Sequence, residues 1–142
     1  MDRELKLFRK TLRQNGYFNT KPRYKLFLAL QEHSSPTIRD LIKKLKGQDQ
    51  ATVYRNIKLF EHLGIVSILQ LGWDSRLELS DNFHHHHHHL TCVSCGKVII
   101  LHEDPAIERR ISHLGSGKNF KAIDHQLEIR GICDSCQTVS TK

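Results

Sequence analysis

The spacing of apolar residues predicts four helices in the first part of the chain. Apolar side chains recur there every three or four residues, which is the repeat of one face of an α-helix. Thr20, Thr37 and Asp49 are suited to cap three of these helices, and glycines follow three of them. The predicted helices cover residues 2–14, 20–33, 37–47 and 49–64.

The fourth predicted helix has one apolar face and one face suited to DNA. Val53, Ile57 and Phe60 lie on the first face, where they can pack against the other helices. The opposite face has the small, hydrogen-bonding and cationic residues expected of a helix whose first turns contact base edges in the major groove. Periodicity alone also fits an ordinary helical domain with a polar exposed face. The residues of the polar face are Gln50, Ala51, Thr52, Tyr54, Arg55 and Lys58.

Two strand-like segments, residues 65–71 and 76–79, follow the helices. The tetrapeptide GWDS between them predicts a hairpin turn. Helices followed by a β-hairpin make a winged helix-turn-helix, the architecture of many DNA-binding domains. We therefore expect a winged-helix DNA-binding domain over residues 1–80.

The rest of the chain predicts a small α/β unit, so the fold class as a whole is α+β. Residues 97–101 form a strand-like apolar run, and a helix can open at Asp104 or Pro105. Residues 120–132 predict one or two further strands. A unit of about 60 residues can build little core, so we expect residues 81–142 to need a structural metal and a partner subunit.

The excess of positive charge is confined to the first domain. Residues 1–80 contain 15 Lys and Arg against 8 Asp and Glu, whereas residues 81–142 contain 7 of each. A basic module joined to a neutral module rich in metal ligands indicates nucleic-acid binding at one end and metal binding at the other. Charge alone leaves open the alternative of a well-solvated basic surface.

We expect no membrane association. The chain has no apolar run near the roughly 20 residues needed to cross a bilayer. Its N-terminal segment also lacks the apolar core of a signal peptide. These two features predict a cytoplasmic protein.

All four cysteines fall in two Cys-x-x-Cys pairs, Cys92 with Cys95 and Cys133 with Cys136. In a reducing compartment such pairs are better interpreted as zinc ligands than as disulfides. Two pairs supply the four thiolates of a closed tetrahedral zinc site, which is typical of structural zinc. Buried reduced thiols or a redox pair are the alternatives. The long interval between the pairs predicts that a strand, a helix and another strand lie between them.

Six consecutive histidines, residues 84–89, run directly into the first cysteine pair. If this segment is extended, alternate rings face opposite sides, so His87 and His89 share one face and His86 and His88 the other. One strand could then supply two metal sites, in which imidazole and carboxylate suit Fe, Mn, Ni, Co or Zn. An expression tag or a loose metal trap is the alternative for such a run, but its internal position favours an ordered site. Further candidate ligands are Glu78, Glu103, Asp104, Glu108, His33 and His125.

The chain resembles the Fur (ferric uptake regulator) family of metal-dependent transcriptional repressors along almost its whole length. The helix motif ATVYRN and the run HHHHLTCVSCGK are together highly specific for this family. The matching stretches are TKPR at 20–23, ATVYRN at 51–56, RLEL at 76–79, HHHHLTCVSCGK at 86–97 and DHQLEIRGICDSC at 124–136.

The resemblance implies a winged-helix DNA-binding domain, an α+β dimerisation domain, a structural Zn²⁺ and a second divalent metal, Fe²⁺, Mn²⁺ or Zn²⁺. The family's hinge-site histidine before the third helix falls at Ser35, so His33 is the histidine of this chain that could replace it. By matching position, the implied structural zinc ligands are Cys92, Cys95, Cys133 and Cys136; the hinge site has Glu78, His87, His89 and His33; the dimerisation-domain site has His86, His88, Glu108 and His125; and the DNA-binding residues are Thr20, Arg23, Ala51, Thr52, Tyr54, Arg55 and Lys58.

The predicted function is that of a metal-responsive transcriptional repressor, which binds a near-palindromic double-stranded DNA operator as a homodimer when its regulatory metal site is filled. A metal-dependent enzyme is the first alternative, because His and carboxylate sites with an open position also catalyse hydrolysis. No motif in the sequence supplies the base or nucleophile that such an enzyme needs. A histidine-rich metal buffer is the second alternative, and it leaves the ATVYRN helix without a use.

Overall fold

The computed structural model describes residues 2–139 and separates them into two compact units. The N-terminal unit ends at His85 and the C-terminal unit begins at His86. The sequence placed the domain boundary between residues 80 and 81, slightly earlier in the chain. The boundary between the compact units therefore falls inside the histidine run.

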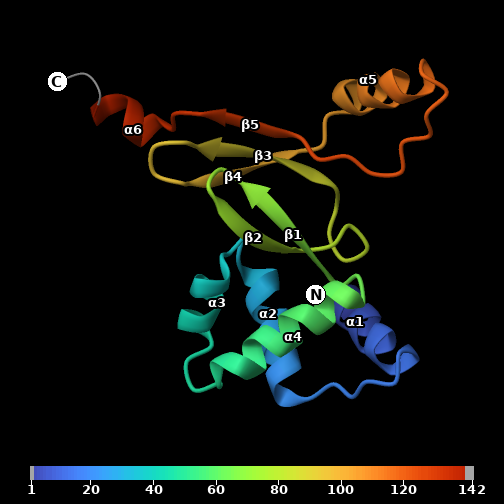
Figure 1. Ribbon diagram of the computed structural model, residues 1–142, viewed down its shortest axis with the longest axis vertical. Helices are drawn as coiled ribbons and strands as arrows, with labels where there is room; N and C mark the ends of the chain where they lie inside the picture. Colours follow the sequence, from blue (N-terminus) through green and yellow to red (C-terminus); the bar gives the residue numbers. More distant parts are fainter. Residues whose placement is uncertain (1, 140–142) are drawn as a thin grey trace. The chain divides into compact units, whose positions relative to one another are not determined.

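The N-terminal unit is a set of four helices followed by a two-stranded antiparallel hairpin (Figure 1). All four predicted helices and the predicted hairpin are confirmed. The turn of the hairpin is shorter than GWDS, because Asp74 already pairs with Leu71. The elements are α1 (Asp2–Gln14), α2 (Lys21–Glu32), α3 (Ile38–Lys44), α4 (Gln50–His62), β1 (Val66–Leu71) and β2 (Asp74–Leu79).

Side chains at the predicted cap positions fix the beginnings of α3 and α4. The Thr37 hydroxyl accepts a hydrogen bond from the Asp40 N–H, and the Asp40 carboxylate accepts one from the Thr37 N–H, which completes a capping box. Asp49 caps α4 by accepting a hydrogen bond from the Thr52 N–H at 3.0 Å. Thr20 stands at the N-cap of α2 but makes no side-chain cap bond.

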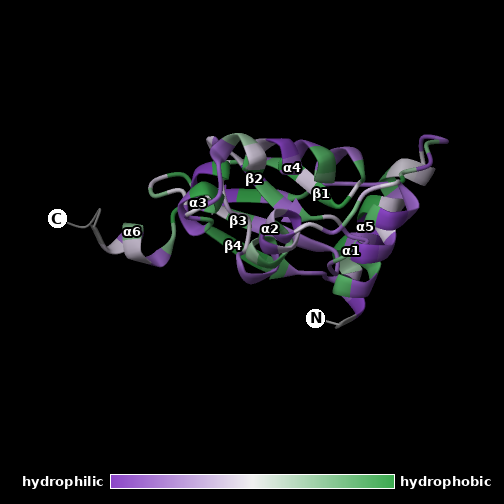
Figure 2. Ribbon diagram, turned by 90° about the horizontal axis from the view of Figure 1, so that it is seen from below, coloured by the Kyte–Doolittle hydropathy of each residue, from purple (hydrophilic) through white to green (hydrophobic). Residues whose placement is uncertain are grey.

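Aromatic packing between α1, α2 and α4 forms the centre of the N-terminal unit. The Phe8 ring stacks on the Phe27 ring with centroids 4.2 Å apart and meets the Phe60 ring edge-on at 5.3 Å. Phe8, Phe27 and Phe60 are fully buried. In Figure 2 the ribbon of α1 carries both apolar and polar colours, as expected of a helix with one face in this core.

The C-terminal unit contains a three-stranded sheet with the strand order β4-β3-β5, in which β3 pairs antiparallel with β4 and parallel with β5 (Figure 1). The predicted strand at 97–101 and the predicted helix after Asp104 are confirmed. The elements are β3 (His87–Cys92), β4 (Val98–His102), α5 (Pro105–Ser116), β5 (Glu128–Gly131) and α6 (Asp134–Val139).

Two features of this unit differ from the predictions. Only the last part of segment 120–132 is a strand: Glu128–Gly131 pairs with β3, and just before it the Leu127 carbonyl accepts a hydrogen bond from the His89 N–H at 3.2 Å. The short helix α6 was not predicted, because its sequence DSCQTV is too short and too polar to show a helical repeat.

The C-terminal unit has almost no apolar interior of its own. Among residues 86–138, whose burial is described, the buried side chains are those of His88, His89, Thr91 and Cys92. Helix α5 has no buried residue. This part of the chain therefore needs other interactions to remain folded. Within residues 2–139 there is also no helix with the length and apolar character of a membrane span.

The aromatic core predicts that α1 is an integral part of the N-terminal unit. Phe8→Ala should lower the free energy of unfolding of this unit by about 3–5 kcal/mol, because it removes a fully buried ring from a packed cluster. Phe18→Ala is the matched control, since Phe18 is 85% exposed and its truncation should change stability by at most about 0.5 kcal/mol. Denaturant unfolding of the two variants measures both values, and equal small effects would contradict this packing.

Candidate metal centres and DNA-binding surface

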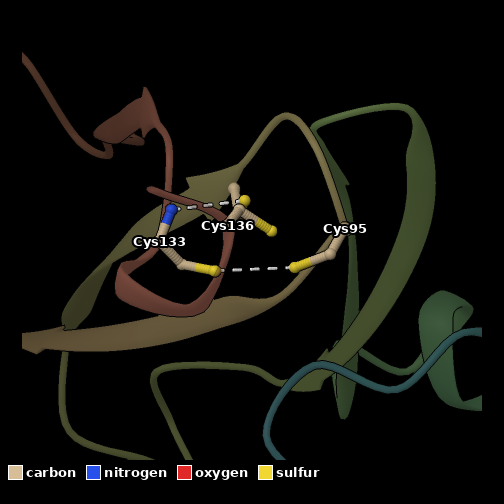
Figure 3. A group of neighbouring side chains, drawn as sticks. Cys95, Cys133 and Cys136 are labelled. Atoms are coloured by element: carbon tan, nitrogen blue, oxygen red, sulfur yellow. Dashed lines mark hydrogen bonds between the residues drawn. The ribbon is translucent and has the colours of Figure 1, made fainter. Parts of the chain in front are cut away.

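The four cysteine sulfurs converge from two separate parts of the chain. Cys92 and Cys95 lie at the end of β3 and in the turn after it, while Cys133 and Cys136 flank the start of α6. All four Sγ atoms lie within 4.8 Å of one another. Figure 3 shows the sulfurs of Cys95, Cys133 and Cys136 directed toward one another. The structure thus brings together all four predicted ligands.

The sulfur spacing fits a shared tetrahedral metal ion. Cys95 Sγ and Cys133 Sγ are 3.7 Å apart. Zinc–sulfur bonds of about 2.3 Å in a tetrahedron place two sulfurs about 3.8 Å apart, whereas a disulfide would bring them to about 2.05 Å. The cysteines are free thiols in the structure. The cluster therefore has the donor set and the dimensions of a structural zinc site.

Backbone N–H groups stabilise negative charge on the sulfur of Cys92 in this cluster. The Cys133 N–H donates to Cys92 Sγ at 3.3 Å, and this bond together with the Cys95 N–H lowers the pKa of Cys92 to about 6. The Ser94 hydroxyl lowers the pKa of Cys136, but hydrogen bonds with the three neighbouring cysteines and burial together raise it to about 11. Thiolates so close together cannot all ionise unless a cation lies among them.

A second group of ligand atoms converges on Glu108 of α5. His88 Nε2 lies 2.7 Å from Glu108 Oε1, and His125 Nε2 lies 3.3 Å from Glu108 Oε2. His86 Nε2 is 3.0 Å from His125 Nε2. Nitrogen ligands on a tetrahedral ion are about 3.3 Å apart when each bond is about 2.0–2.1 Å. All four predicted residues of the dimerisation-domain site therefore lie at a spacing suited to a divalent ion.

The other face of β3 carries His87 and His89. Their ring centroids are 4.9 Å apart, so the alternation of the histidine run between two faces is confirmed for the part that forms a strand. His84 and His85 precede β3 and belong to neither converging group. The contacts of His86 with His125 and of His88 with Glu108 favour an ordered site over the interpretation as a tag.

The remaining hinge-site candidates, Glu78 and His33, lie in the N-terminal unit. His33 follows α2, where its Nε2 is 2.8 Å from Lys44 Nζ, and it belongs to no converging ligand group among residues 2–139. The Ser35 hydroxyl instead donates a hydrogen bond to Glu78 on β2. Ser35 is 1% exposed, and the sequence did not identify it as a site residue. The sequence feature that could have identified Ser35 is its position, which a histidine occupies in the family.

The proposed DNA-reading residues lie on one exposed face of α4. Val53, Ile57 and Phe60 are buried, as predicted, while Tyr54 is 47% exposed and Arg55 and Lys58 are exposed. Arg55 Nη2 donates to Thr52 Oγ1 at 3.0 Å, which aligns the guanidinium along the helix. Ala51 and Thr52 occupy the first turn of this face.

The two residues near α2 that were predicted to contact DNA have different environments. Thr20 is exposed at the N-cap. Arg23 is half-buried, donates from Nη1 to the Phe18 carbonyl at 2.6 Å and lies over the Tyr17 ring at 5.4 Å. Arg23 therefore holds the loop before α2 in place, a role that the sequence did not predict.

Comparison with known proteins identifies the class. Residues 14–130 match the Ferric uptake regulator family. The chain is 32% identical to the peroxide operon regulator of Bacillus subtilis, over 94% of this chain and 93% of that protein. It is 34% identical to the ferric uptake regulation protein of Campylobacter upsaliensis, over 93% and 88% of the two chains.

Solved structures agree with the sequence comparison. The ferric uptake regulator of Helicobacter pylori, described as having three functional metal binding sites, aligns with a TM-score of 0.79 at 26% identity, over 96% of this chain and 93% of that one. The Vibrio cholerae ferric uptake regulator aligns with a TM-score of 0.74 at 33% identity, over 88% and 98% of the two chains. The chain belongs to the ferric uptake regulator family. It is a transcription regulator and not an enzyme, as predicted.

The cysteine cluster makes a specific prediction. Cys133→Ser should release tightly bound zinc and unfold the C-terminal unit, because apparent zinc-binding energies of about 10–16 kcal/mol at such sites are also folding energy. Ser135→Ala, an exposed position between the last two cysteines, should keep both zinc and fold. Metal analysis and circular dichroism measure the two properties. A Cys133→Ser protein that stays folded without zinc would contradict the four-cysteine assignment.

Proposed function

We propose that this protein is a homodimeric repressor that binds a near-palindromic operator when a divalent metal, Fe²⁺, Mn²⁺ or Zn²⁺, fills its regulatory site. The arrangement of β3 is the observation that carries the proposal. Cys92 at the end of the strand contributes one thiol to the four-cysteine group, while the strand's histidines present possible ligand atoms on both faces. Structural and regulatory metal binding can thus be separate functions of one strand.

The ligand group around Glu108 suggests how metal could act within the C-terminal unit. His86 and His88 come from β3, Glu108 from α5, and His125 from the segment before β5. A divalent ion held by these four side chains would cross-link three segments that share almost no apolar core. Its binding energy would then contribute directly to ordering the unit.

We further propose that the hinge set of Glu78, His87 and His89 transmits metal binding to the N-terminal unit. Glu78 belongs to the N-terminal unit and the two histidines belong to β3. Within the N-terminal unit, Glu78 accepts the hydrogen bond from Ser35, and Ser35 O accepts a bond from Arg76 Nη1 at 2.9 Å. These bonds connect Glu78 to the segment that leads into α3. Through α3 they connect it to the helical part of the N-terminal unit, which includes α4.

The surface of the C-terminal unit suits a second copy of the chain. Strands β4 and β5 form the two edges of its sheet within the described residues, and edge strands are common places of pairing with another chain. Ile99, Ile129 and Ile132 are each more than 40% exposed and line one apolar groove. Large exposed apolar side chains on a unit without a core indicate an interface. A dimer would bury them, and two winged helices would match the symmetry of a near-palindromic site.

Metal-dependent DNA binding is the direct test of the proposed function. A duplex is first selected from a random-sequence library by the native protein, and its affinity is then measured with each of the three metals added in turn. At least one metal should raise the affinity by about 5- to 150-fold, the usual range of coupling between two sites. The same affinity with every metal and without added metal would refute the proposal.

The DNA-reading face predicts loss of affinity at two positions. Tyr54→Ala and Arg55→Ala should each weaken binding to the selected duplex by about 1–3 kcal/mol if they contact base edges, while metal content stays unchanged. Glu61→Ala is a control on α4, because Glu61 is exposed in the last turn, away from the first turns that would contact bases. Fluorescence anisotropy measures the three affinities. Parent-like binding by both variants would remove α4 from the DNA interface.

Substitutions can distinguish the proposed sensing role of the histidines from the proposed structural role of the cysteines. The double variant His87→Ala, His89→Ala should keep its zinc and its dimer, yet lose the metal-dependent part of the operator affinity. His62→Ala, His113→Ala removes two histidines that belong to no ligand group among the described residues, and it should respond to metal as the parent does. An undiminished response in the His87, His89 variant would assign sensing to His86, His88, Glu108 and His125 instead.

A further inference from the structure

Ser35, in the segment that leads into α3, combines a strained backbone with a buried side chain. Its φ angle is +52°, in the left-handed region that glycine adopts readily and serine rarely. Pro36 follows it, and a residue before proline normally has an extended backbone. Among the non-glycine residues of segment 2–139, Asn119 alone shares a positive φ, and asparagine tolerates this region better. Glycine at position 35 would relieve the strain, so a serine here indicates a use for its hydroxyl.

Contacts with β2 hold this strained residue in place. Arg76 Nη1 donates to Ser35 O at 2.9 Å. The Leu77 N–H donates to Pro36 O, also at 2.9 Å, and Thr37 forms an isolated antiparallel bridge with Arg76. Three consecutive residues before α3 are thus paired with two consecutive residues of β2. Such a network allows a strained conformation to persist.

The Ser35 hydroxyl is hydrogen-bonded to a carboxylate. It donates to Oε1 of Glu78, which follows Leu77 on β2. Ser35 is 1% exposed, so little water competes for this bond. A hydrogen bond to an ionised carboxylate is about twice as strong as one between neutral groups. The bond therefore fixes the direction in which the carboxylate of Glu78 points.

We propose that Ser35 is the residue that positions Glu78 for metal binding. Its hydroxyl engages Oε1, so Glu78 binds the ion through its other oxygen, Oε2, in a fixed orientation. Ser35 is not itself a ligand and acts on the metal only through Glu78. Metal ligands are commonly oriented by hydrogen bonds of this kind, and removal of such a bond lowers metal affinity. This inference rests on the proposed function and deepens it, because it assumes that Glu78 is a ligand of the hinge set.

A purely structural hydrogen bond is the alternative role of Ser35. Buried polar groups are normally paired, so the hydroxyl could serve only to stabilise the loop. Two substitutions distinguish the roles. Ser35→Ala removes the hydroxyl and keeps an unfavourable backbone, whereas Ser35→Gly removes the hydroxyl and relieves the strain. A structural role makes metal affinity follow stability, while a positioning role makes both variants lose metal affinity equally.

The test measures the Mn²⁺ affinity and the stability of both variants. Zinc-loaded, full-length protein is titrated in a calorimeter with Mn²⁺, an ion that suits carboxylate ligands. The hinge component of the isotherm is the one that disappears in the His87→Ala, His89→Ala variant. Ser35→Ala and Ser35→Gly should both weaken this component by about 10–100-fold, although Ser35→Gly should unfold at a higher denaturant concentration than Ser35→Ala. Ser34→Ala, at the exposed neighbouring serine, should match the parent in both properties.

A double-mutant cycle with Glu78 identifies the route of the effect. Glu78→Ala should weaken the hinge component by itself, and Mn²⁺ is raised until the weakened site fills. If Ser35 acts only through Glu78, Ser35→Ala adds no further loss in that background. If Ser35 acts through the conformation of the loop, the two losses add. Additive losses would overturn the positioning role.

Two further outcomes would also overturn it. One is parent-like Mn²⁺ affinity in both Ser35→Ala and Ser35→Gly, which would exclude the positioning role even if metal regulates DNA binding. The other is a loss in Ser35→Ala that Ser35→Gly reverses, because metal affinity would then follow stability.

The same titrations separate this inference from the proposed function. An equal loss in Ser35→Ala and Ser35→Gly that vanishes in the Glu78→Ala background would support the positioning role. It would do so even if none of the three metals changed the affinity for the selected duplex, a result that would refute the regulatory proposal. An isotherm without any component that depends on His87 and His89 would overturn the positioning role together with the hinge set, and would leave regulation to the group around Glu108.

Discussion

The four thiols of the C-terminal unit tie together a part of the chain that has almost no apolar interior. Cys92 is the single buried apolar residue among residues 86–138, and α5 buries no side chain. The cysteine pairs join the turn after β3 to the start of α6, across the parallel pairing of β3 with β5. Because hydrophobic burial is so small here, we expect metal binding by these thiols to contribute much of the unit's stability. The positions of the β3 histidines depend on the same contacts, because these contacts hold β3 in place.

In the proposed function, stability and sensing therefore use different chemistry on neighbouring residues. Four closely spaced thiolates favour tight, closed coordination, in which no position is left for exchange. Imidazole and carboxylate ligands bind divalent ions in competition with protons and with other metals. The N-terminal unit has the opposite construction, with a packed aromatic core around Phe8 and an excess of positive charge on its surface. It can thus remain folded while metal occupancy changes elsewhere.

Local sequence signals predicted most of the fold. The helical repeat gave the four N-terminal helices, and the two-residue alternation of a strand gave the separation of His86 and His88 from His87 and His89. The signals failed where structure depends on a partner or on very few residues. In segment 120–132 only Glu128–Gly131 pairs with β3 as a strand, and α6 is too short to show a helical repeat of its own. The Ser35–Glu78 bond joins residues distant in sequence, which no local pattern reveals.

Thermodynamic reciprocity tests most directly whether metal binding and DNA binding are coupled in this protein. The affinity of the regulatory metal should be measured by calorimetry, first without DNA and then with saturating selected duplex. If the two sites are coupled, the duplex must strengthen metal binding by the same factor by which the metal strengthens DNA binding. A metal affinity that is identical with and without the duplex would contradict the account.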